Sequence, residues 1–376
     1  MTRFERNIAG DIGVGPKGRI PVAQVRGLDT QVLIVGGGLA GSLAALLLAR
    51  RGQNPIVVDP FEAETDDLRG ETFSGDEIDL ARSLGVTEAF GGELAMATSG
   101  YRRGDMVAAV RALWPDRVMA VAGRAVGIVP GDQVVTTLLA DGLQLTSRVA
   151  VVACQSDSGL LRRLGVDRVA SSTRHACVVA FDVTVRPESQ AYLDGAMAFG
   201  ADGVDGRVTF VQDGDKVRVN VALFDDMLSL RVQRFRRMPL VMLAQGLPSC
   251  KGRFAGARLI GAPTVWSTDL ATSSHSSRDG VVLIGEARAA ACPVTGGAMA
   301  RILGDVQLLT RTHLPQWLAS ASVGGDRIEG FYRDINIAKR DRMLLRRSRA
   351  ARQLATSPAL VWSAARMVAA IRRKAA

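Results

Sequence analysis

Several features that would assign this sequence to a protein class are scarce or absent. Its four cysteines show no C-x-x-C spacing and its three histidines are scattered, so the sequence predicts neither a disulfide framework nor a metal site. No apolar run reaches the roughly 18 to 20 residues that cross a bilayer. Residues 1–29 carry charges and glycines without the apolar core of a signal peptide, and we expect them to form a loosely ordered lead-in. These absences favour a protein of the reducing cytoplasm.

Lysine is also rare, since only five of the 47 basic residues are lysines and arginine therefore carries most of the net charge of +10. The arginines are dispersed and no nucleic-acid-binding module accompanies them, so we expect no nucleic-acid partner. Much of the excess charge lies between residues 333 and 374. We interpret it as a solvated helix face, with contact to an anionic membrane surface or an acidic partner as the alternative.

The most informative stretch that is present, QVLIVGGGLAGSLAALLLARRGQNPIVVD, predicts one βαβ unit over residues 31–59. Its parts are a strand over 31–35, a G-x-G-x-x-G turn, a helix over 43–51 and a second strand over 55–58. Gly36 would permit the tight bend, Gly38 would let a diphosphate approach the backbone, and Gly41 would let helix and strand pack closely. Asp59 lies 18 residues beyond Gly41, about where a carboxylate meets a ribose hydroxyl. The unit predicts a dinucleotide site; a glycine-rich turn that only packs is the alternative.

The rest of the chain predicts an α/β protein, and 376 residues can bury a large core in two lobes. Turns between β-branched runs predict a β-meander with strands over 118–129, 133–139 and 143–154. A second sheet is predicted from residue 176, with a hairpin over 208–223 and a helix over 225–244. The chain then returns to a buried strand over 281–284, followed by Gly285 and Glu286 at the strand end where parallel sheets bind ligands.

We therefore predict a Rossmann-like dinucleotide-binding domain with an inserted β-meander, a mixed-sheet substrate domain and C-terminal helices. The predicted boundaries are 1–29 for the lead-in, 30–170 with 263–325 for the discontinuous dinucleotide domain, 171–262 for the substrate domain and 326–376 for a basic helical region.

From about Gln31 to about Trp317 the sequence resembles the FAD-dependent group A, or aromatic-hydroxylase-like, flavoprotein monooxygenases. Three blocks carry the resemblance: the glycine turn with Asp59, then Arg69-Gly70-Glu71 with the helix DLARSLGV, and then VVLIGEARAAACPVTGGAMARILGDVQLL, which is similar to the superfamily's second flavin motif. Within the superfamily the motifs are most similar to those of squalene epoxidases, which carry P-x-T-G-G-x-M where this chain has Pro293 to Met299.

The resemblance implies a bound FAD and gives individual residues a role in binding it. Gly36, Gly38 and Gly41, with Leu39 and Ala40 in the same turn, would hold the diphosphate, and Asp59 the adenosine ribose. Arg69 and Arg103 would lie near the flavin, and Gly285-Glu286 would stand on the ribityl or phosphate side. The stretch from Pro293 through Gly296, Gly297, Ala298 and Met299 would pass the isoalloxazine ring, with the N–H groups of Gly296 and Gly297 facing its pyrimidine edge.

The chain departs from the superfamily's pattern in three places. Relatives carry D-G-x-x-S-x-x-R after the meander, whereas only Arg162 keeps register in the stretch 155–162. This departure leaves direct use of NADPH open; Asp157 could substitute by a local shift, and a simple surface turn is the alternative. Glu286 replaces an aspartate with a longer carboxylate. Fewer residues than expected lie between the LGV helix and Arg103, which indicates that part of the usual substrate-side sheet is trimmed.

The last residues predict one further helix. Ser357-Pro358 could cap it, and Leu360, Ala364, Met367 and Ile371 would share one face. We favour packing of this face against the flavin domain, with peripheral contact to a membrane surface as the alternative.

The activity that the resemblance implies is FAD-dependent monooxygenation. Reduced FAD would react with O2 to form a C4a-hydroperoxide, which hydroxylates or epoxidises an apolar terpenoid, polyprenyl or fused-ring molecule. NADPH, NADH or a separate reductase would supply electrons. Because the oxygen chemistry belongs to the cofactor, no side chain is named as catalytic. Two alternatives stay open: an FAD-dependent isoprenoid reductase or dehydrogenase, and a non-catalytic flavin-binding protein.

Overall fold

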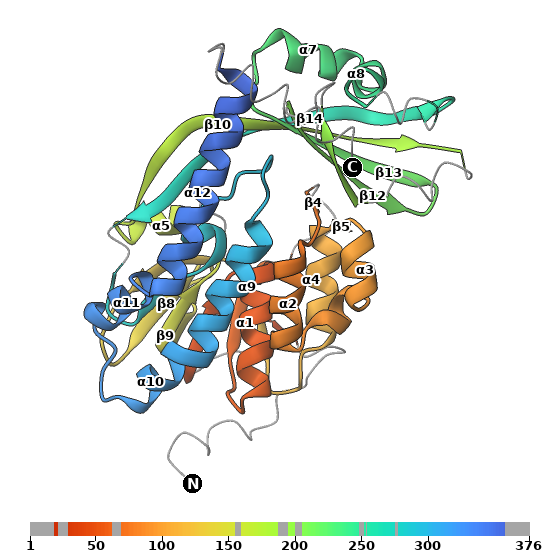
Figure 1. Ribbon diagram of the computed structural model, residues 1–376. Helices are drawn as coiled ribbons and strands as arrows, with labels where there is room; N and C mark the ends of the chain where they lie inside the picture. Colours follow the sequence, from red (N-terminus) through yellow and green to blue (C-terminus); the bar gives the residue numbers. More distant parts are fainter. Residues whose placement is uncertain are drawn as a thin grey trace.

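The computed structural model describes residues 19–21, 29–61, 69–154, 159–186, 195–199, 205–247, 252, 254–274 and 277–357. These residues form a lower layer around a mainly parallel sheet and an upper layer around an antiparallel sheet (Figure 1). The long helix α12 runs beside both layers, so the chain returns to the first layer after forming the second (Figure 1).

The larger sheet has eight strands in the order β1-β6-β3-β2-β9-β8-β7, with β15 also paired to β9. Its strands are β1 (Arg19–Pro21), β2 (Asp29–Val35), β3 (Ile56–Asp59), β6 (Met119–Ala122), β7 (Ala125–Val129), β8 (Val135–Leu139), β9 (Gln144–Val152) and β15 (Val281–Leu283). Strand β8 pairs antiparallel with β7 on one side and with β9 on the other, as the predicted meander requires, and the other pairs are parallel.

Two predictions within this sheet need correction. The predicted strand over 118–129 divides into β6, which belongs to the parallel part, and β7, which opens the meander. Part of the predicted lead-in is also a strand, because β1 pairs with β6. The dinucleotide-binding architecture with an inserted meander is confirmed.

Both faces of the parallel strands are buried. In β2, Val32 and Ile34 pack on the side of the helices, whereas Leu33 and Val35 pack toward the meander. The helices of the first side are α1 (Leu39–Arg50), α2 (Gly75–Leu84), α4 (Arg103–Ala112) and α9 (Ala298–Leu308), and α5 (Gly159–Arg163) lies on the other side. Strands that are covered on both faces consist of continuous apolar runs, as this one does.

Shorter elements complete the first layer: the ribbon of β4 (Gly70–Glu71) and β5 (Tyr101–Arg102), a 3-10 turn (Thr87–Phe90), α3 (Glu93–Thr98), a 3-10 turn (Gly285–Ala287), a π turn (Leu309–His313), α10 (Leu314–Ala319) and α11 (Gly325–Tyr332).

The second sheet has the strand order β11-β12-β13-β10-β14, and its pairs are antiparallel rather than mixed. Its strands are β10 (Asp167–Thr184), β11 (Gly195–Phe199), β12 (Gly206–Asp213), β13 (Lys216–Leu223) and β14 (Arg258–Ser274). The sheet therefore extends beyond the predicted range of 171–262 at both ends. The helix predicted over 225–244 is two helices, α7 (Leu230–Arg237) and α8 (Pro239–Gly246), because proline cannot continue a helix from the preceding turn.

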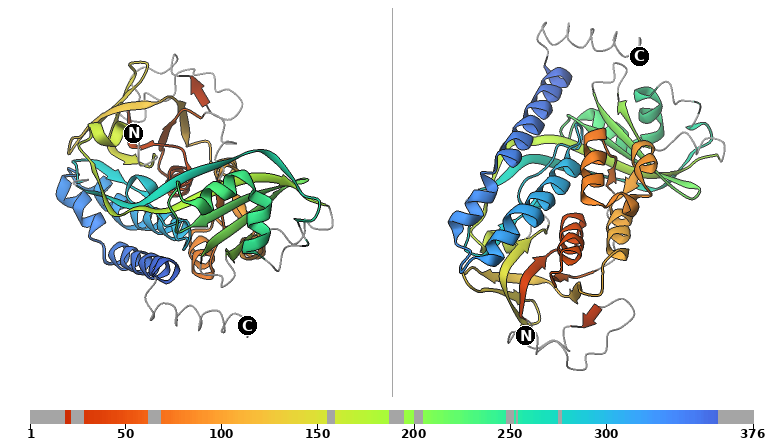
Figure 2. Two further views of the ribbon diagram at one scale, coloured as in Figure 1. Left: turned by 90° about the horizontal axis from the view of Figure 1, so that it is seen from above. Right: turned by 60° about the horizontal axis from the view of Figure 1, so that its bottom comes forward.

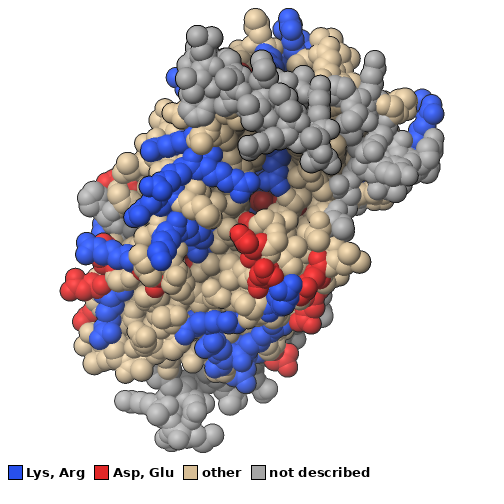
Figure 3. Space-filling view, in the orientation of Figure 1, with Lys and Arg blue, Asp and Glu red and all other residues tan. Residues whose placement is uncertain are grey.

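The last described element, α12 (Ile335–Thr356), is 22 residues long. Figure 2 shows it alongside the first layer and reaching the second sheet. Basic side chains gather along it on the face seen in Figure 3. No helix within the described ranges is long and apolar enough to cross a membrane. The predicted terminal helix lies outside the described residues.

Candidate cofactor and substrate site

The three glycines of the first turn are needed for three different reasons. Gly36 has a φ of +104°, a conformation that side chains rarely adopt. A Cβ on Gly41 would lie 1.9 Å from the Gly36 carbonyl oxygen, so only glycine lets the helix approach this closely. A Cβ on Gly38 would meet nothing within 4 Å, which leaves open space in front of the backbone. Glycine at position 38 therefore leaves room for a ligand to approach the backbone of the turn.

Helix α1 begins at Leu39, directly after this open position, rather than at the predicted residue 43. Its N-cap residue, Gly38, offers no side chain to accept the first N–H groups, and the first turn contains no acidic residue. The N-terminus of a helix attracts anions through these N–H groups and the helix dipole. Leu39 and Ala40 therefore lie where a diphosphate would find donors.

Asp59 ends β3 beside the same turn. Its Oδ2 accepts the Gly37 N–H at 2.7 Å, and its Oδ1 accepts the Phe61 N–H at 2.8 Å. The carboxylate thus holds the turn in place, and its side chain keeps 23% exposure from which it can meet a ribose.

Arg111 is a residue of this site that the sequence analysis missed. Its Nη2 donates to the Gly37 carbonyl at 2.5 Å, and its guanidinium lies 4.7 Å from the centre of the Phe61 ring. It is also 3.9 Å from Asp59 Oδ1. A cation next to the open turn suits a phosphate-bearing ligand. The sequence feature that could have indicated Arg111 is its position two turns after Arg103 on the same helix.

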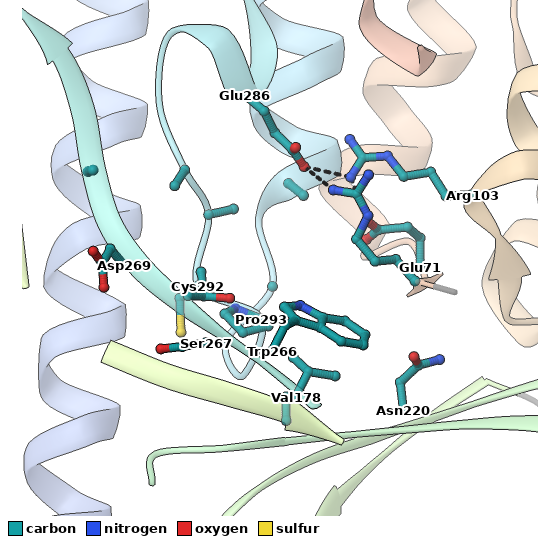
Figure 4. Close-up of a pocket in the computed structure, with 18 of the residues that line it drawn as sticks. Glu71, Arg103, Val178, Asn220, Trp266, Ser267, Asp269, Glu286, Cys292 and Pro293 are labelled. Carbon is teal, nitrogen blue, oxygen red and sulfur yellow. Dashed lines mark hydrogen bonds and ion pairs between the residues drawn. The ribbon is translucent and has the colours of Figure 1, made fainter. Parts of the chain in front are cut away.

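A second group of charged residues forms where the β4–β5 ribbon meets the end of β15. Pairing of Gly70 with Arg102 aligns the two short strands, and the Arg103 N–H donates to the Arg69 carbonyl at 3.1 Å. Both arginines then converge on one carboxylate: the distances from Arg69 Nη1 and Arg103 Nη1 to Glu286 Oε1 are 2.7 and 2.6 Å. Figure 4 shows Glu286 directed toward Arg103. The structure thus brings together three predicted site residues from distant parts of the chain.

The electrostatics of this cluster favour a charged Glu286. Burial alone would raise the pKa of Glu286, but Arg103 and Arg69 lower it to about 2. Glu71 lies nearby, 3.6 Å from Arg103 Nη1, and here burial outweighs the arginines and raises the pKa of its carboxyl. The cluster therefore holds two arginines against a charged Glu286, with a second carboxyl, Glu71, whose charged form burial disfavours.

The loop after Glu286 contains two left-handed glycines, Gly296 and Gly297, with φ of +73° and +99°. Gly297 is the N-cap of α9, so Ala298 and Met299 open that helix, and Met299 is buried. The Gly296 N–H donates to the Cys292 carbonyl at 2.9 Å, so this predicted donor to the flavin is engaged within the loop itself. A Cβ on Gly297 would lie 2.5 Å from Leu344 Cδ2 of α12, so the helix holds the loop from behind.

The loop is fixed at its start by two further residues. Arg168, on β10, donates to the carbonyl oxygens of Glu286 and Ala287, each at 3.3 Å. The Gly285 N–H donates to Asp305 Oδ2 at 3.1 Å, and Asp305 is fully buried. Backbone position at Glu286 is thus set from both the second sheet and α9.

A cavity of about 1340 Å³ opens between these elements. Arg69, Glu71, Arg103, Glu286, Pro293, Gly296 and Ala298 line it from the first layer. Val178, Arg207, Ala222, Thr264 and Trp266 line it from the second sheet. Figure 4 shows the loop residues Cys292 and Pro293 over the sheet residues Val178 and Trp266. Residues 155–158, where the resemblance led us to look for a D-G motif, lie outside the described residues, whereas Arg162 lines the cavity.

These residues fit FAD on structural grounds. The open position at Gly38 and the uncapped start of α1 suit a diphosphate. A Cβ on Gly285 would lie 3.0 Å from Ala40 Cβ, so the chain at Glu286 adjoins the first turn, and the Glu286 cluster and the glycine loop line the cavity. Within the described ranges no group of three or more histidine, cysteine or acidic residues could hold a metal ion.

Comparisons with known proteins agree with this fit. Residues 29–180 match the family model described as FAD binding domain. A squalene monooxygenase from Eremothecium gossypii is 33% identical over 69 residues, which is 18% of this chain and 14% of that protein. The match thus spans a small part of the length of that curated relative.

Solved structures resemble the whole described fold. The p-nitrophenol 4-monooxygenase from Pseudomonas putida has a TM-score of 0.66 and 17% identity, over 91% of this chain and 93% of that chain. The Diels-Alderase of pyrroindomycin biosynthesis has a TM-score of 0.66 and 16% identity, over 91% of this chain and 77% of that chain.

The fold and the matched domain define a flavin-binding protein of the α/β class. The FAD-binding match covers residues 29–180, less than half of the chain, and the likeness to the solved monooxygenase is a likeness of fold.

Proposed function

We propose that this protein is an FAD-dependent monooxygenase that hydroxylates or epoxidises a small molecule with an apolar body. One observation supports this most: the glycine loop after Glu286 and the inner face of the second sheet bound the same cavity. A cofactor held by the loop and a substrate held by the sheet would therefore meet within it.

The chain's own part in the reaction is binding, orientation and exclusion of water. The turn at Gly38 would hold the diphosphate, and the Glu286 cluster would orient the middle of the cofactor. Trp266 and Val178 offer apolar surface to a terpenoid, polyprenyl or fused-ring body. Bound FAD, once reduced, supplies the reactivity toward O2. A dry cavity keeps that reactivity for the substrate.

The electron donor we propose is NADPH or NADH, with a separate reductase as the alternative route. The short match to a squalene monooxygenase supports an isoprenoid substrate, since it is a local likeness to a protein whose name states that substrate. Peripheral membrane contact through the terminal residues stays a proposal, because they lie beyond the described part of the chain.

The test is turnover of the FAD-loaded protein with isotopically labelled O2, NADPH or NADH, and a panel of squalene, polyprenols and fused-ring phenols. Incorporation of one labelled oxygen atom into product is expected. Product formed without oxygen, in anaerobic solution, would instead identify a reductase or dehydrogenase. If FAD binds but no member of the panel reacts, the result favours the non-catalytic alternative. If FAD does not bind, the proposed function is wrong.

A further inference from the structure

The second sheet turns both polar and apolar side chains toward the cavity, whereas its other face is apolar. On β12, Val208 and Phe210 are fully buried against α7 and α8, whereas Arg207 and Thr209 line the cavity. On β13, Asn220 lines the cavity in the same way. A cavity wall intended only for hydrocarbon would not need these groups, because a buried polar group is costly unless it finds a partner.

Positive charge exceeds negative charge around this cavity. Within the described residues, six arginines line it against four acidic residues. Arg69 and Arg103 converge on Glu286, and Arg168 is bonded to backbone carbonyls, as described above. These three arginines are therefore engaged in contacts that hold the site together.

Arg207 differs from them in its position. It lies near the start of β12 and lines the cavity, and its Nη2 donates to Thr72 Oγ1. Its Nη1 lies 2.6 Å from the place of a Cβ on Gly296, so the guanidinium stands where the sheet meets the glycine loop. No carboxylate is within ion-pairing distance of it among the salt bridges recorded for the described residues.

The charge of Arg207 is incompletely compensated. Burial lowers the pKa of its guanidinium, and the carboxyls of Glu71 and Glu77 offset only part of that effect. Glu71 lines the same cavity, and burial raises the pKa of its own carboxyl. Arg207 is partly buried. A partly buried cation is stabilised by an anion that completes its hydrogen bonds, and the planar guanidinium matches a carboxylate or phosphate.

We propose that the substrate is amphiphilic, with an oxyanion head group bound by Arg207 and an apolar body lying along Val178 and Trp266. The inference rests on the proposed function, because it places the substrate in the same cavity and adds the class of its head group. The head group is a carboxylate or a phosphate, which share the chemistry that a guanidinium recognises.

The experiment measures ligand binding to the FAD-loaded protein through the change in flavin absorbance. The probes are farnesoic acid, its methyl ester and farnesyl monophosphate, and a second pair is 2-naphthoic acid with 2-naphthamide. Either acid or the phosphate should bind about 10- to 100-fold more tightly than its neutral counterpart, as expected for a charge-assisted hydrogen-bonded pair. The ratio of acid to phosphate affinity identifies the source of the oxyanion.

Variants then locate the effect. Arg207→Gln should reduce acid affinity to the level of the neutral probe and leave the neutral probe unchanged, and Arg207→Lys should retain part of the preference. Arg218→Gln is the control. Arg218 lies on β13, on the same face of the strand as Asn220, but it bonds Asp182 at 2.6 Å and does not line the cavity. The wild-type comparison of acid with neutral probe stands even if a variant fails to fold.

The proposal would be overturned if the wild type bound neither the acids nor the phosphate more tightly than the neutral probes, or bound neither acid nor phosphate up to their solubility limits. Loss of FAD affinity in Arg207→Gln with an unchanged acid preference would also overturn it, since the cation would then serve the cofactor. Failure of the wild type to bind FAD contradicts the proposed function instead. Tight binding of an acid without oxygen transfer would contradict the proposed monooxygenase reaction but would still support an oxyanion head group bound by Arg207.

Discussion

The two sheets of this protein bury their side chains in different ways. In the first sheet, neighbouring residues of β2 such as Leu33 and Ile34 point to opposite faces, and both are fully buried among apolar groups. In the second sheet, Phe210 faces an apolar core whereas its neighbour Thr209 faces the cavity. The first sheet is thus buried on both faces, whereas one face of the second sheet lines the cavity. A polar face of an otherwise covered sheet is therefore a sign of a binding site.

The largest expected effect separates the two faces of the second sheet. Phe210→Ala should lower the free energy of unfolding by about 3 to 5 kcal/mol, because it removes a fully buried ring from the core beneath α7 and α8. Thr209→Val, one residue earlier, should change it by about 1 kcal/mol or less. Urea unfolding followed by circular dichroism compares them. Equal losses for the two variants would contradict the distinction between wall and core.

The next effect tests the symmetry of the first sheet. Leu33→Ala and Ile34→Ala should each cost about 2 to 5 kcal/mol, because both side chains are 0% exposed although they point to opposite faces. The same unfolding measurement applies. A cost confined to Ile34→Ala would show that the face covered by the meander is not a true core.

How much of this arrangement the sequence could predict depends on the range of the interactions. The βαβ unit at Gly36 was predictable because its turn, helix and terminal acid are local. The apolar runs of β12 and β13 likewise predicted a hairpin. In contrast, β14 pairs with β10 over a separation of about 90 residues and carries polar residues, so no local pattern indicated it.

The same reasoning applies to the site. Arg69, Arg103 and Glu286 were predicted one by one through the resemblance, but their convergence depends on the β4–β5 ribbon, which joins short segments without strong strand character. Arg111 was missed because its role comes from lying beside the turn in space. The engagement of the Gly296 N–H within its own loop also depends on backbone conformation that the motif letters do not contain.

A smaller, pH-dependent effect tests the contact between the second sheet and α12. His175 on β10 is bonded to Ser348 of α12, with 2.8 Å between Nε2 and Oγ. Burial, followed by Arg352 and Arg349, lowers the pKa of His175 from 6.5 to about 4. His175 therefore binds a proton near pH 6.5 in the unfolded chain but only near pH 4 in the folded protein. Because the unfolded state binds more protons between these values, the free energy of unfolding falls as pH decreases from 6.5 to 4.

His175→Gln removes this titrating group. The difference in unfolding free energy between wild type and variant should shrink as pH falls from 6.5 toward 4, since only the wild type loses the histidine contribution. Urea unfolding at several pH values measures it. A difference that stays constant across that range would show that His175 is not held neutral by its surroundings.

The most direct test of the central claim is FAD binding to the wild type and to Gly38→Ala, measured by titration calorimetry and by retention of flavin through gel filtration. A Cβ at Gly38 meets nothing within 4 Å, so the apoprotein should fold and melt as the wild type does. The same Cβ would fill the space into which the diphosphate approaches, and FAD affinity should fall by about tenfold or more. Unchanged FAD affinity in Gly38→Ala, or no FAD binding by the wild type, would contradict the assignment of this turn as the cofactor site.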